Sequence, residues 1–381
     1  ARMTATDPFQ PVGQCEKENK SCALTQRRPR HQTWIASING DRGHRLFTAF
    51  RPAVTRFLAI LLVCNLLLAA CAQYQNEYST APLETAAHLP NADISVEIPW
   101  LSNCTHAEQT QLNLDSGQPV IVIVHGCFSS AGRFRSLANV FAFHGQQAIC
   151  FNYDDRASLI ESSARLITAI TELSNVLRHT DIHVIGHSQG GLVARRAFID
   201  ERPDPFDARD ANISLTTIST PFGGIRSASH CGSRAYAWFS LGLSRVACKL
   251  VTGDKYREIP PGSDFIENPG ELSPTINSHL KISTDETDSC RAYNSRGSCI
   301  NDDFVFSVAE QTQEAIDDDV GLSSVLVKAG HVEIVGDGHS APTKLIGILQ
   351  QHSILNATPE DMSEELVGLL RHLYLSDHYL E

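Results

Sequence analysis

The sequence predicts an α/β fold in which a mostly parallel central sheet is covered by helices on both faces. Two observations lead to this prediction. Apolar, β-branched runs alternate along the chain with segments of helical periodicity, and residues 120–124 are apolar at every position. A strand of that composition is expected to be buried on both faces, as the strands of parallel sheets are. The alternation of strands and helices then implies right-handed crossover connections.

The expected elements follow in chain order. Strands are expected at residues 120–124, 147–153, 181–185 and 213–218, with helices at 158–177 and 190–199. Further strands are expected at 304–308 and 332–335, followed by a helix at 342–352. A terminal helix should begin after Thr358, which can cap it, with Pro359 at the first helical position.

Residues 57–70 (FLAILLVCNLLLAA) form an apolar run of 14 that follows Arg51 and Arg56. A helix needs about 20 apolar residues to span a bilayer, so this run instead fits a secretory signal. It ends in Leu-Ala-Ala-Cys71, which resembles the bacterial lipobox, whose Cys is lipidated and becomes the mature N-terminus. The resemblance implies an exported lipoprotein, and Ala72 after the Cys favours the outer membrane. An uncleaved anchor or a buried helix is the alternative.

Composition divides the chain into parts with different expected roles. These are a leader region over 1–70 (irregular over 1–50, with the signal and lipobox at about 51–71), a linker at 72–91, the α/β domain at 92–356 and a C-terminal helix at 357–381. Within the domain, residues 222–303 are rich in Gly, Ser, Pro, Asn and Cys. So long an irregular stretch in a compact domain is usually functional, and we expect a lid-like insert.

The charge of the chain is distributed unevenly. Residues 1–56 carry ten Lys and Arg against four acidic residues, which is a net charge of +6. Because the whole chain has a net charge of −12, the rest of it carries about −18. An acidic body is a poor partner for nucleic acid, because phosphates require neutralisation by Lys and Arg. No internal repeat indicates a solenoid.

Seven cysteines follow Cys71, at positions 104, 127, 150, 231, 248, 290 and 299. Outside the cytosol they are expected to form disulfides. The local pairs Cys231/Cys248 and Cys290/Cys299 are the natural candidates, although spacing does not fix connectivity and one thiol must remain. No spacing of Cys or His suggests a metal site, and no cofactor is expected.

The decisive motif is Gly186-His187-Ser188-Gln189-Gly190, which matches G-x-S-x-G between an apolar strand and an amphipathic helix. Such a turn lifts the Ser188 hydroxyl above the sheet at a helix N-terminus, so we predict that Ser188 is a nucleophile. Side chains two positions to either side would collide in so tight a turn, which explains the glycines. The alternative is an ordinary glycine-rich turn.

A serine nucleophile needs a histidine base, and in this type of site the chain order is Ser, acid, His. His339 follows the expected strand at 332–335 and is the predicted base. His331 precedes that strand and is therefore expected at the opposite edge of the sheet.

The acid should follow the expected strand at 304–308, where residues 317–319 are three consecutive aspartates. One carboxylate suffices to hold the imidazole, and three buried neighbours would repel one another. Asp154 and Asp155 are the alternatives if none of the three serves.

Together these features resemble the lipase and esterase branch of the α/β-hydrolase superfamily over residues 92–356. The matching segments are His125-Gly126, Gly186 to Gly191, Thr220 to Gly224, the aspartate cluster and His339. Aligned without gaps to the acid motif D-G-x-V-P-L-x-S of such lipases, the chain places Asp317 at the acid position, with Asp318 as the second choice. The resemblance also implies an oxyanion hole formed by the backbone N–H groups of Cys127 and Gln189. A free reactive thiol is the alternative role for Cys127.

The expected activity is hydrolysis of a carboxylic ester, with a lipid-like substrate, through an acyl-enzyme on Ser188. His339 would transfer the proton and Asp317 would orient His339, with no metal or cofactor. The apolar segment 237–243 in the insert could cover an acyl pocket. Two alternatives stay open: a phospholipase, thioesterase or acyltransferase with the same triad, or a catalytically silent binding lipoprotein on this scaffold.

Overall fold

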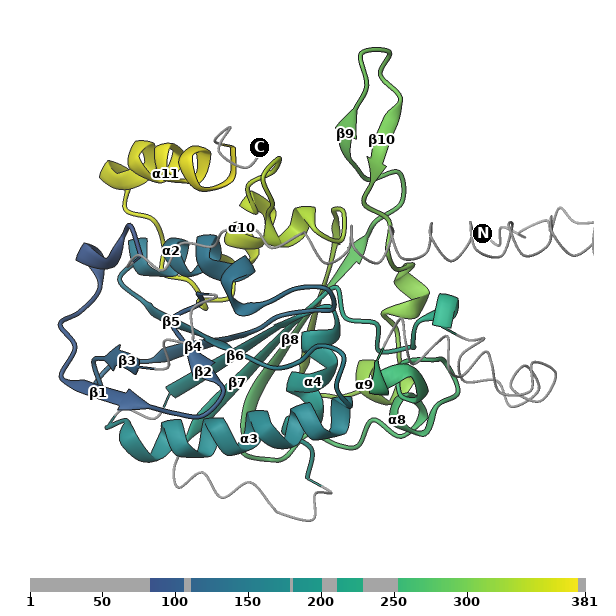
Figure 1. The fold of residues 1–381 in the computed structure, drawn as a ribbon, viewed down its shortest axis with the longest axis horizontal. Helices are drawn as coiled ribbons and strands as arrows, with labels where there is room; N and C mark the ends of the chain where they lie inside the picture. Colours follow the sequence, from purple (N-terminus) through teal and green to yellow (C-terminus); the bar gives the residue numbers. More distant parts are fainter. Residues whose placement is uncertain (1–82, 106–110, 179–180, 201–210, 229–252, 376–381) are drawn as a thin grey trace, which may run out of the picture. The chain divides into compact units, whose positions relative to one another are not determined.

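The computed structural model describes residues 83–105, 111–178, 181–200, 211–228 and 253–375 (Figure 1). All of them belong to the second of two units into which the chain divides, residues 76–381. The leader with Cys71, most of the linker, the cysteines 231 and 248 and the segment 237–243 lie outside the described residues. Within the described ranges, no helix has both the length and the apolar character to cross a membrane.

A seven-stranded sheet with the order β11-β8-β7-β6-β4-β5-β2 forms the centre of this unit. Its strands are β2 (Leu101–Ser102), β4 (Val120–Val124), β5 (Gln147–Phe151), β6 (Asp181–His187), β7 (Asn212–Ile218), β8 (Ile276–Asp285) and β11 (Leu322–Lys328). All neighbouring strands are parallel except β2, which pairs antiparallel with β5. The structure thus confirms the predicted fold class and the four strands expected from 120 to 218.

Helices cover both faces of the sheet (Figure 1). On one face, α3 (Leu159–Val176) and α4 (Gln189–Ala197) pack against a core that includes Val120, Val122 and Val124. On the other, α2 (Arg135–Phe143), α10 (Thr343–Gln351) and α11 (Ser363–Leu375) pack with Ile121 and Ile123. Successive side chains of a strand point to opposite faces, so the uniformly apolar β4 contributes to both cores.

Two strands were expected in the wrong places. Residues 304–306 form no strand and are followed by the 3₁₀ helix η5 (Val308–Glu310), while Glu333–Val335 is the 3₁₀ helix η6. The sheet instead takes β8 and β11, whose sequences INSHLKISTD and LSSVLVK mix apolar with polar residues. β11 is an edge strand and exposes its serines, whereas His279, Lys281 and Thr284 of β8 are buried and hydrogen-bonded to other residues. The expected insert at 222–303 is therefore not a single insert, since it contains a strand of the central sheet.

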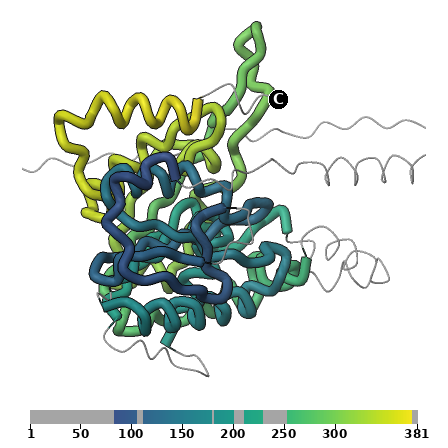
Figure 2. Tube along the Cα trace, turned by 60° about the vertical axis from the view of Figure 1, so that its left-hand side comes forward, coloured from purple at the N-terminus to yellow at the C-terminus, as the bar shows by residue number. Residues whose placement is uncertain are grey.

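A hairpin leaves the sheet between β8 and β11. It consists of β9 (Cys290–Tyr293) and β10 (Cys299–Asp302), joined by the expected disulfide Cys290–Cys299. The hairpin projects away from the helix-covered sheet in both views (Figures 1 and 2). A second disulfide, Cys104–Cys150, ties the segment after β2 to β5, and Cys127 is free.

Short elements complete the described part of the chain. β1 (Ile94–Glu97) pairs with β3 (Gln111–Leu114) in a separate two-stranded sheet. The remaining helices are α8 (Asp264–Glu267), α9 (Glu314–Asp317), η1 (Ala86–His88), η2 (Ala131–Phe134), η3 (Arg226–Ala228), η4 (Asp254–Arg257) and η7 (Glu360–Met362).

Candidate active site

Ser188 lies in the tight turn between β6 and α4, with φ 55° and ψ −126°. Residues with a side chain rarely adopt this region, which costs on the order of 1–3 kcal/mol and persists only where the surroundings enforce it. Here the Ser188 amide donates to the carbonyl of Ile218 on β7 at 2.8 Å. The strain is therefore held by the neighbouring strand.

The glycines around Ser188 are sterically required, as the sequence indicated. A Cβ at Gly186 would lie 2.6 Å from the carbonyl oxygen of Gly190, and a Cβ at Gly190 would lie 2.2 Å from that of Val124. Gly126, after β4, is equally close to the turn, because a Cβ there would lie 2.9 Å from the Cβ of Ser188. The loop after β4 therefore passes directly beside the candidate nucleophile.

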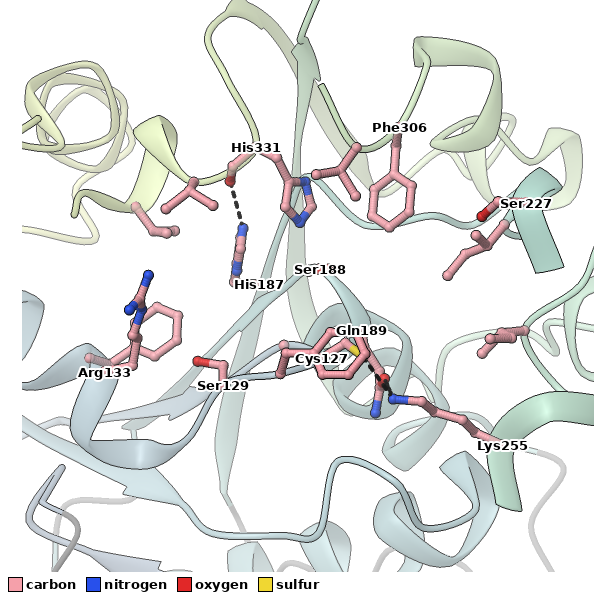
Figure 3. A pocket seen from close by; sticks show the side chains of 18 of the residues that line it. Cys127, Ser129, Arg133, His187, Ser188, Gln189, Ser227, Lys255, Phe306 and His331 are labelled. Atoms are coloured by element: carbon pink, nitrogen blue, oxygen red, sulfur yellow. Dashed lines mark hydrogen bonds between the residues drawn. The ribbon is translucent and has the colours of Figure 1, made fainter. Parts of the chain in front are cut away.

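Ser188 opens into a cavity of about 730 Å³ (Figure 3). Several of its lining residues are apolar, namely Phe128, Phe134, Ile225, Ala228, Ile259, Val305, Phe306, Val332 and Val335. The other side chains that line it are polar or charged, namely Cys127, Ser129, Arg133, His187, Gln189, Ser227, Lys255, Arg291 and His331. An apolar cavity with a few converging polar groups is the usual form of a small-molecule site.

His331 lies in the same cavity wall as Ser188 and is buried. Its Nδ1 lies 2.9 Å from the Oε1 of Glu286 and 2.9 Å from the Oγ of Ser219. Its Nε2 forms no hydrogen bond with any residue in the described ranges. The ring points toward Ser188 (Figure 3). The imidazole is therefore oriented by a carboxylate through one nitrogen and faces the nucleophile's cavity with the rest of its ring.

The Glu286 carboxylate is only 1% exposed and has a hydrogen-bond donor at each oxygen. Oε2 accepts from the amides of Val305 at 2.6 Å and Phe306 at 2.7 Å, and Oε1 accepts from the hydroxyls of Ser219 and Thr284. Burial raises the pKa of Glu286, but the hydrogen bond and charge of His331 and the two amides outweigh it, so the pKa lies below its ordinary value. Glu286 is thus held as a carboxylate beside the imidazole.

The backbone of His331 is also fixed. His187 Nε2 donates to the His331 carbonyl at 3.0 Å, and burial, followed by the charge of His331, holds the pKa of His187 well below its ordinary value. Asp303, the residue after β10, accepts from the amides of Val332 and Glu333, while its own carbonyl accepts from the His331 amide at 3.0 Å. The base of the hairpin therefore holds the turn that carries His331.

The structure does not bring the predicted base and acid to Ser188. His339 is exposed in the turn from Asp337 to Ser340 and is not part of the cavity wall. Asp317 lies at the end of α9, ahead of β11, where its carboxylate pairs with Lys281 and accepts from the Gln313 amide.

Both corrections have one cause. The carboxyl ends of parallel strands lie at one edge of the sheet, and the real strands end at residues 285 and 328, immediately before Glu286 and close before His331. His331 thus follows a strand rather than preceding one. The other candidate acids do not contact His331 either. Asp318 and Asp319 are exposed, and the Asp155 carboxylate accepts from the Phe128 amide at 2.8 Å.

Cys127 and Gln189, the predicted oxyanion residues, both line the cavity beside Ser188. Cys127 follows Gly126 in the loop after β4, and Gln189 is the first residue of α4. Neither backbone amide donates a hydrogen bond to any residue of the described ranges. Both amides are therefore available as donors, and their side chains meet at the buried ammonium of Lys255.

Sequence reasoning missed Glu286 and Lys255, and it placed His331 at the wrong edge of the sheet. The strands that position Glu286 and His331 could have been found from apolar residues spaced two apart. These are Leu280 and Ile282 in β8, and Val325 and Val327 in β11. In the described ranges, no group of three His, Cys, Asp or Glu side chains is placed to hold a metal ion.

The sequence matches no protein-family model and no curated protein. Among solved structures, a lipase from Bacillus licheniformis in mature form is similar, with 14% identity over 62% of this chain and 93% of that chain and a TM-score of 0.43. An α/β hydrolase from Vibrio vulnificus has 11% identity over 62% of this chain and 72% of that chain, with a TM-score of 0.35. Esterase B from Lactobacillus rhamnosis has 12% identity over 84% of this chain and 96% of that chain, also with a TM-score of 0.35.

The architecture of the chain itself identifies the fold. A mostly parallel sheet has helices on both faces, and a G-x-S-x-G turn at the end of β6 presents a serine with positive φ ahead of a helix. An acidic residue and a histidine follow at the carboxyl ends of two later strands, in the chain order of that fold. The chain therefore has the α/β-hydrolase fold.

Proposed function

We propose that the chain is a serine-dependent carboxylic ester hydrolase with Ser188, His331 and Glu286 as its triad. The observation that carries the proposal is His331, which lines the cavity into which Ser188 opens and is hydrogen-bonded to the buried carboxylate of Glu286 behind it. Ser188 and His331 line one cavity, and Glu286 holds His331 from behind, an arrangement that supports the roles of nucleophile, base and orienting acid.

In the proposed reaction, Ser188 Oγ attacks the ester carbonyl as its proton passes to Nε2 of His331. The Glu286 carboxylate accepts from Nδ1–H and stabilises the imidazolium. The amides of Cys127 and Gln189 donate to the oxyanion of the tetrahedral intermediate. His331 then returns the proton to the departing alkoxide. Water repeats the sequence on the acyl-enzyme, releasing the acid and restoring Ser188.

The cavity supports an apolar acyl group as the substrate's main feature. Its apolar side chains include Phe134, Ile259 and Phe306, and its volume of about 730 Å³ falls in the range that holds small organic ligands. We therefore propose lipid-like esters as substrates. The same triad is compatible with acyl transfer, and the acceptor, water or an alcohol, decides between the two.

Labelling with a fluorophosphonate probe tests the proposal directly, because such probes react with an activated serine. We expect the wild-type chain to be labelled and Ser188→Ala to be neither labelled nor active, while its circular dichroism spectrum is unchanged. Residual hydrolysis within tenfold of wild type would exclude Ser188 as the nucleophile. A series of nitrophenyl esters of increasing chain length, followed by emulsified triglyceride, then defines the acyl preference.

We further propose that the protein is exported and anchored through a lipidated Cys71, with the outer membrane as its site. The signal-like segment 57–70 and the lipobox support this proposal. So do the disulfides Cys104–Cys150 and Cys290–Cys299, which persist in oxidising compartments. Cys71→Ser should release the protein from membranes or leave it as the precursor. A membrane fraction equal to wild type, with residues 57–70 still attached, would instead indicate an uncleaved anchor.

A further inference from the structure

Lys255 is a buried lysine that the proposed reaction does not use. Lys255 is only 2% exposed. Its Nζ donates to the Cys127 Sγ at 3.0 Å, to the Gln189 Oε1 at 2.5 Å and to the Asp155 carbonyl oxygen at 2.5 Å. The Asp155 carboxylate is the nearest counter-charge, at 3.6 Å. Lysine is almost never fully buried unless it is paired, so a position that keeps one there is unusual.

The two side-chain acceptors of Lys255 come from separate parts of the fold. Cys127 belongs to the loop after β4, and Gln189 is the first residue of α4, directly after Ser188. Figure 3 shows the Lys255 side chain reaching in from η4 and ending beside both of them. One ammonium group therefore joins the two residues whose backbone amides flank the candidate nucleophile.

The surrounding contacts make this junction rigid. The Gln189 Nε2 donates to the Asp155 carbonyl at 2.9 Å, and the Asp155 carboxylate accepts from the Phe128 amide at 2.8 Å. Lys255, Asp155 and Gln189 thus form a closed network that includes the residue directly after Cys127. A shift of the segment that carries the Cys127 amide or of the one that carries the Gln189 amide would break hydrogen bonds to a buried charge. Such hydrogen bonds are costly to lose.

We propose that Lys255 is a positioning residue that sets the separation of the Cys127 and Gln189 amides and places a fixed positive charge beside the oxyanion. The proposal rests on the proposed function. In this role Lys255 adds no chemical step to the reaction. Deleting one oxyanion donor outright lowers kcat by about 10²–10³-fold. Loosening two donors by removing the lysine should lower kcat by roughly 10–100-fold, a smaller effect of the same kind.

The test compares Lys255→Met with Lys281→Met. Lys281 is a matched control, because it is also a buried lysine paired with an aspartate, Asp317, but it is not part of the cavity wall. Both variants should unfold at a lower temperature than wild type. Only Lys255→Met should show the fall in kcat, with KM for nitrophenyl butyrate changed less than threefold. Its inhibition constant for an alkyl boronic acid, which forms a tetrahedral anion on serine, should rise by the same factor as kcat falls.

A second set of variants keeps the test independent of the folding of Lys255→Met. Gln189→Leu and Cys127→Ala remove the side-chain acceptors but retain both backbone amides, so each should lower kcat and weaken boronate binding. Combined with Lys255→Met, each should add little further loss, because the partners of one network are not additive. Full additivity of the two losses overturns the proposal.

Other outcomes separate this proposal from the one it rests on. A wild-type chain that is labelled and active, together with a Lys255→Met variant of unchanged kcat and boronate affinity, overturns the role of Lys255 alone. A change in KM without a change in kcat would make Lys255 a wall of the substrate pocket and also overturns it. An equal loss of kcat in Lys281→Met reduces the effect to general destabilisation. A wild-type chain that is neither labelled nor active overturns both proposals.

Discussion

The imidazole of His331 and the carboxylate of Glu286 form a buried pair, with 2.9 Å between Nδ1 and Oε1, although 45 residues separate them in the chain. Glu286 directly follows β8, and His331 lies three residues after β11. Since these two strands are parallel neighbours, their carboxyl ends lie side by side. The pair therefore follows from the sheet order, as does its position near the turn that ends β6.

The first prediction contrasts the two histidines. His331→Ala should lower kcat by at least about 10³-fold, because it removes the base that activates the serine. His339→Ala should stay within twofold of wild type, because that side chain is exposed and outside the cavity. Steady-state hydrolysis of nitrophenyl butyrate measures both. The opposite ranking would return the base to His339.

The second prediction concerns the acid. Glu286→Gln keeps the size and an acceptor oxygen but removes the charge that stabilises the imidazolium, and we expect kcat to fall by about 10²–10⁴-fold with KM nearly unchanged. Asp317→Asn is the matched control, since Asp317 pairs with Lys281 rather than with a histidine. It should lower the thermal stability and leave kcat within about threefold. Equal activity of Glu286→Gln and wild type would exclude Glu286 as the orienting acid.

The third prediction follows from the lowered pKa of Glu286. A carboxyl whose folded pKa lies below its unfolded value stabilises the fold fully above the unfolded value, which is close to the ordinary 4.5. That contribution disappears as the pH falls through the lower folded pKa. The difference in free energy of unfolding between wild type and Glu286→Gln, measured by urea denaturation from pH 7 to pH 3, should therefore shrink below about pH 4.5. A difference that is constant or grows on acidification would contradict the assigned direction.

The fourth prediction ranks the two disulfides. Cys104–Cys150 closes a loop with a sequence separation of 46, and Cys290–Cys299 closes one of 9. Chain-entropy arguments give about 4 kcal/mol for the longer loop and about 2.7 kcal/mol for the shorter one. Replacing Cys104 and Cys150 by Ala should thus lower the midpoint of urea unfolding more than the same replacement at Cys290 and Cys299. The reverse order would mean that the hairpin is part of the cooperative core.

The sequence predicts those parts of the fold in which burial leaves an unmistakable pattern. The apolar β4 and the G-x-S-x-G turn at Ser188 are of this kind, since each has a composition that few other structures permit. β8 and β11 mix lysines and serines with apolar residues, since β11 is an edge strand and β8 buries hydrogen-bonded polar side chains. With those two strands displaced, the rule on chain order led to Asp317 and His339, which do not line the cavity of Ser188.

Lys255 could not be predicted for a different reason. A lysine in a segment rich in Gly and Pro is normally a surface residue, and no local pattern indicates otherwise. Its burial depends on three acceptors from Cys127, Asp155 and Gln189, which lie 66 or more positions away in the chain. Such a contact becomes visible only when the tertiary structure is known.

The hairpin formed by β9 and β10 divides into two regions with different evolutionary freedom. Its base is constrained, because Asp303 holds the turn of His331, and Arg291 contacts both Asp303 and Asp337. Its tip, residues 294–298, is exposed and hydrogen-bonds only locally. Relatives of this chain should therefore differ in the length and sequence of the tip while keeping an acidic residue at its foot. The tip is also the natural place to graft a peptide tag or a binding loop without disturbing the chemistry below it.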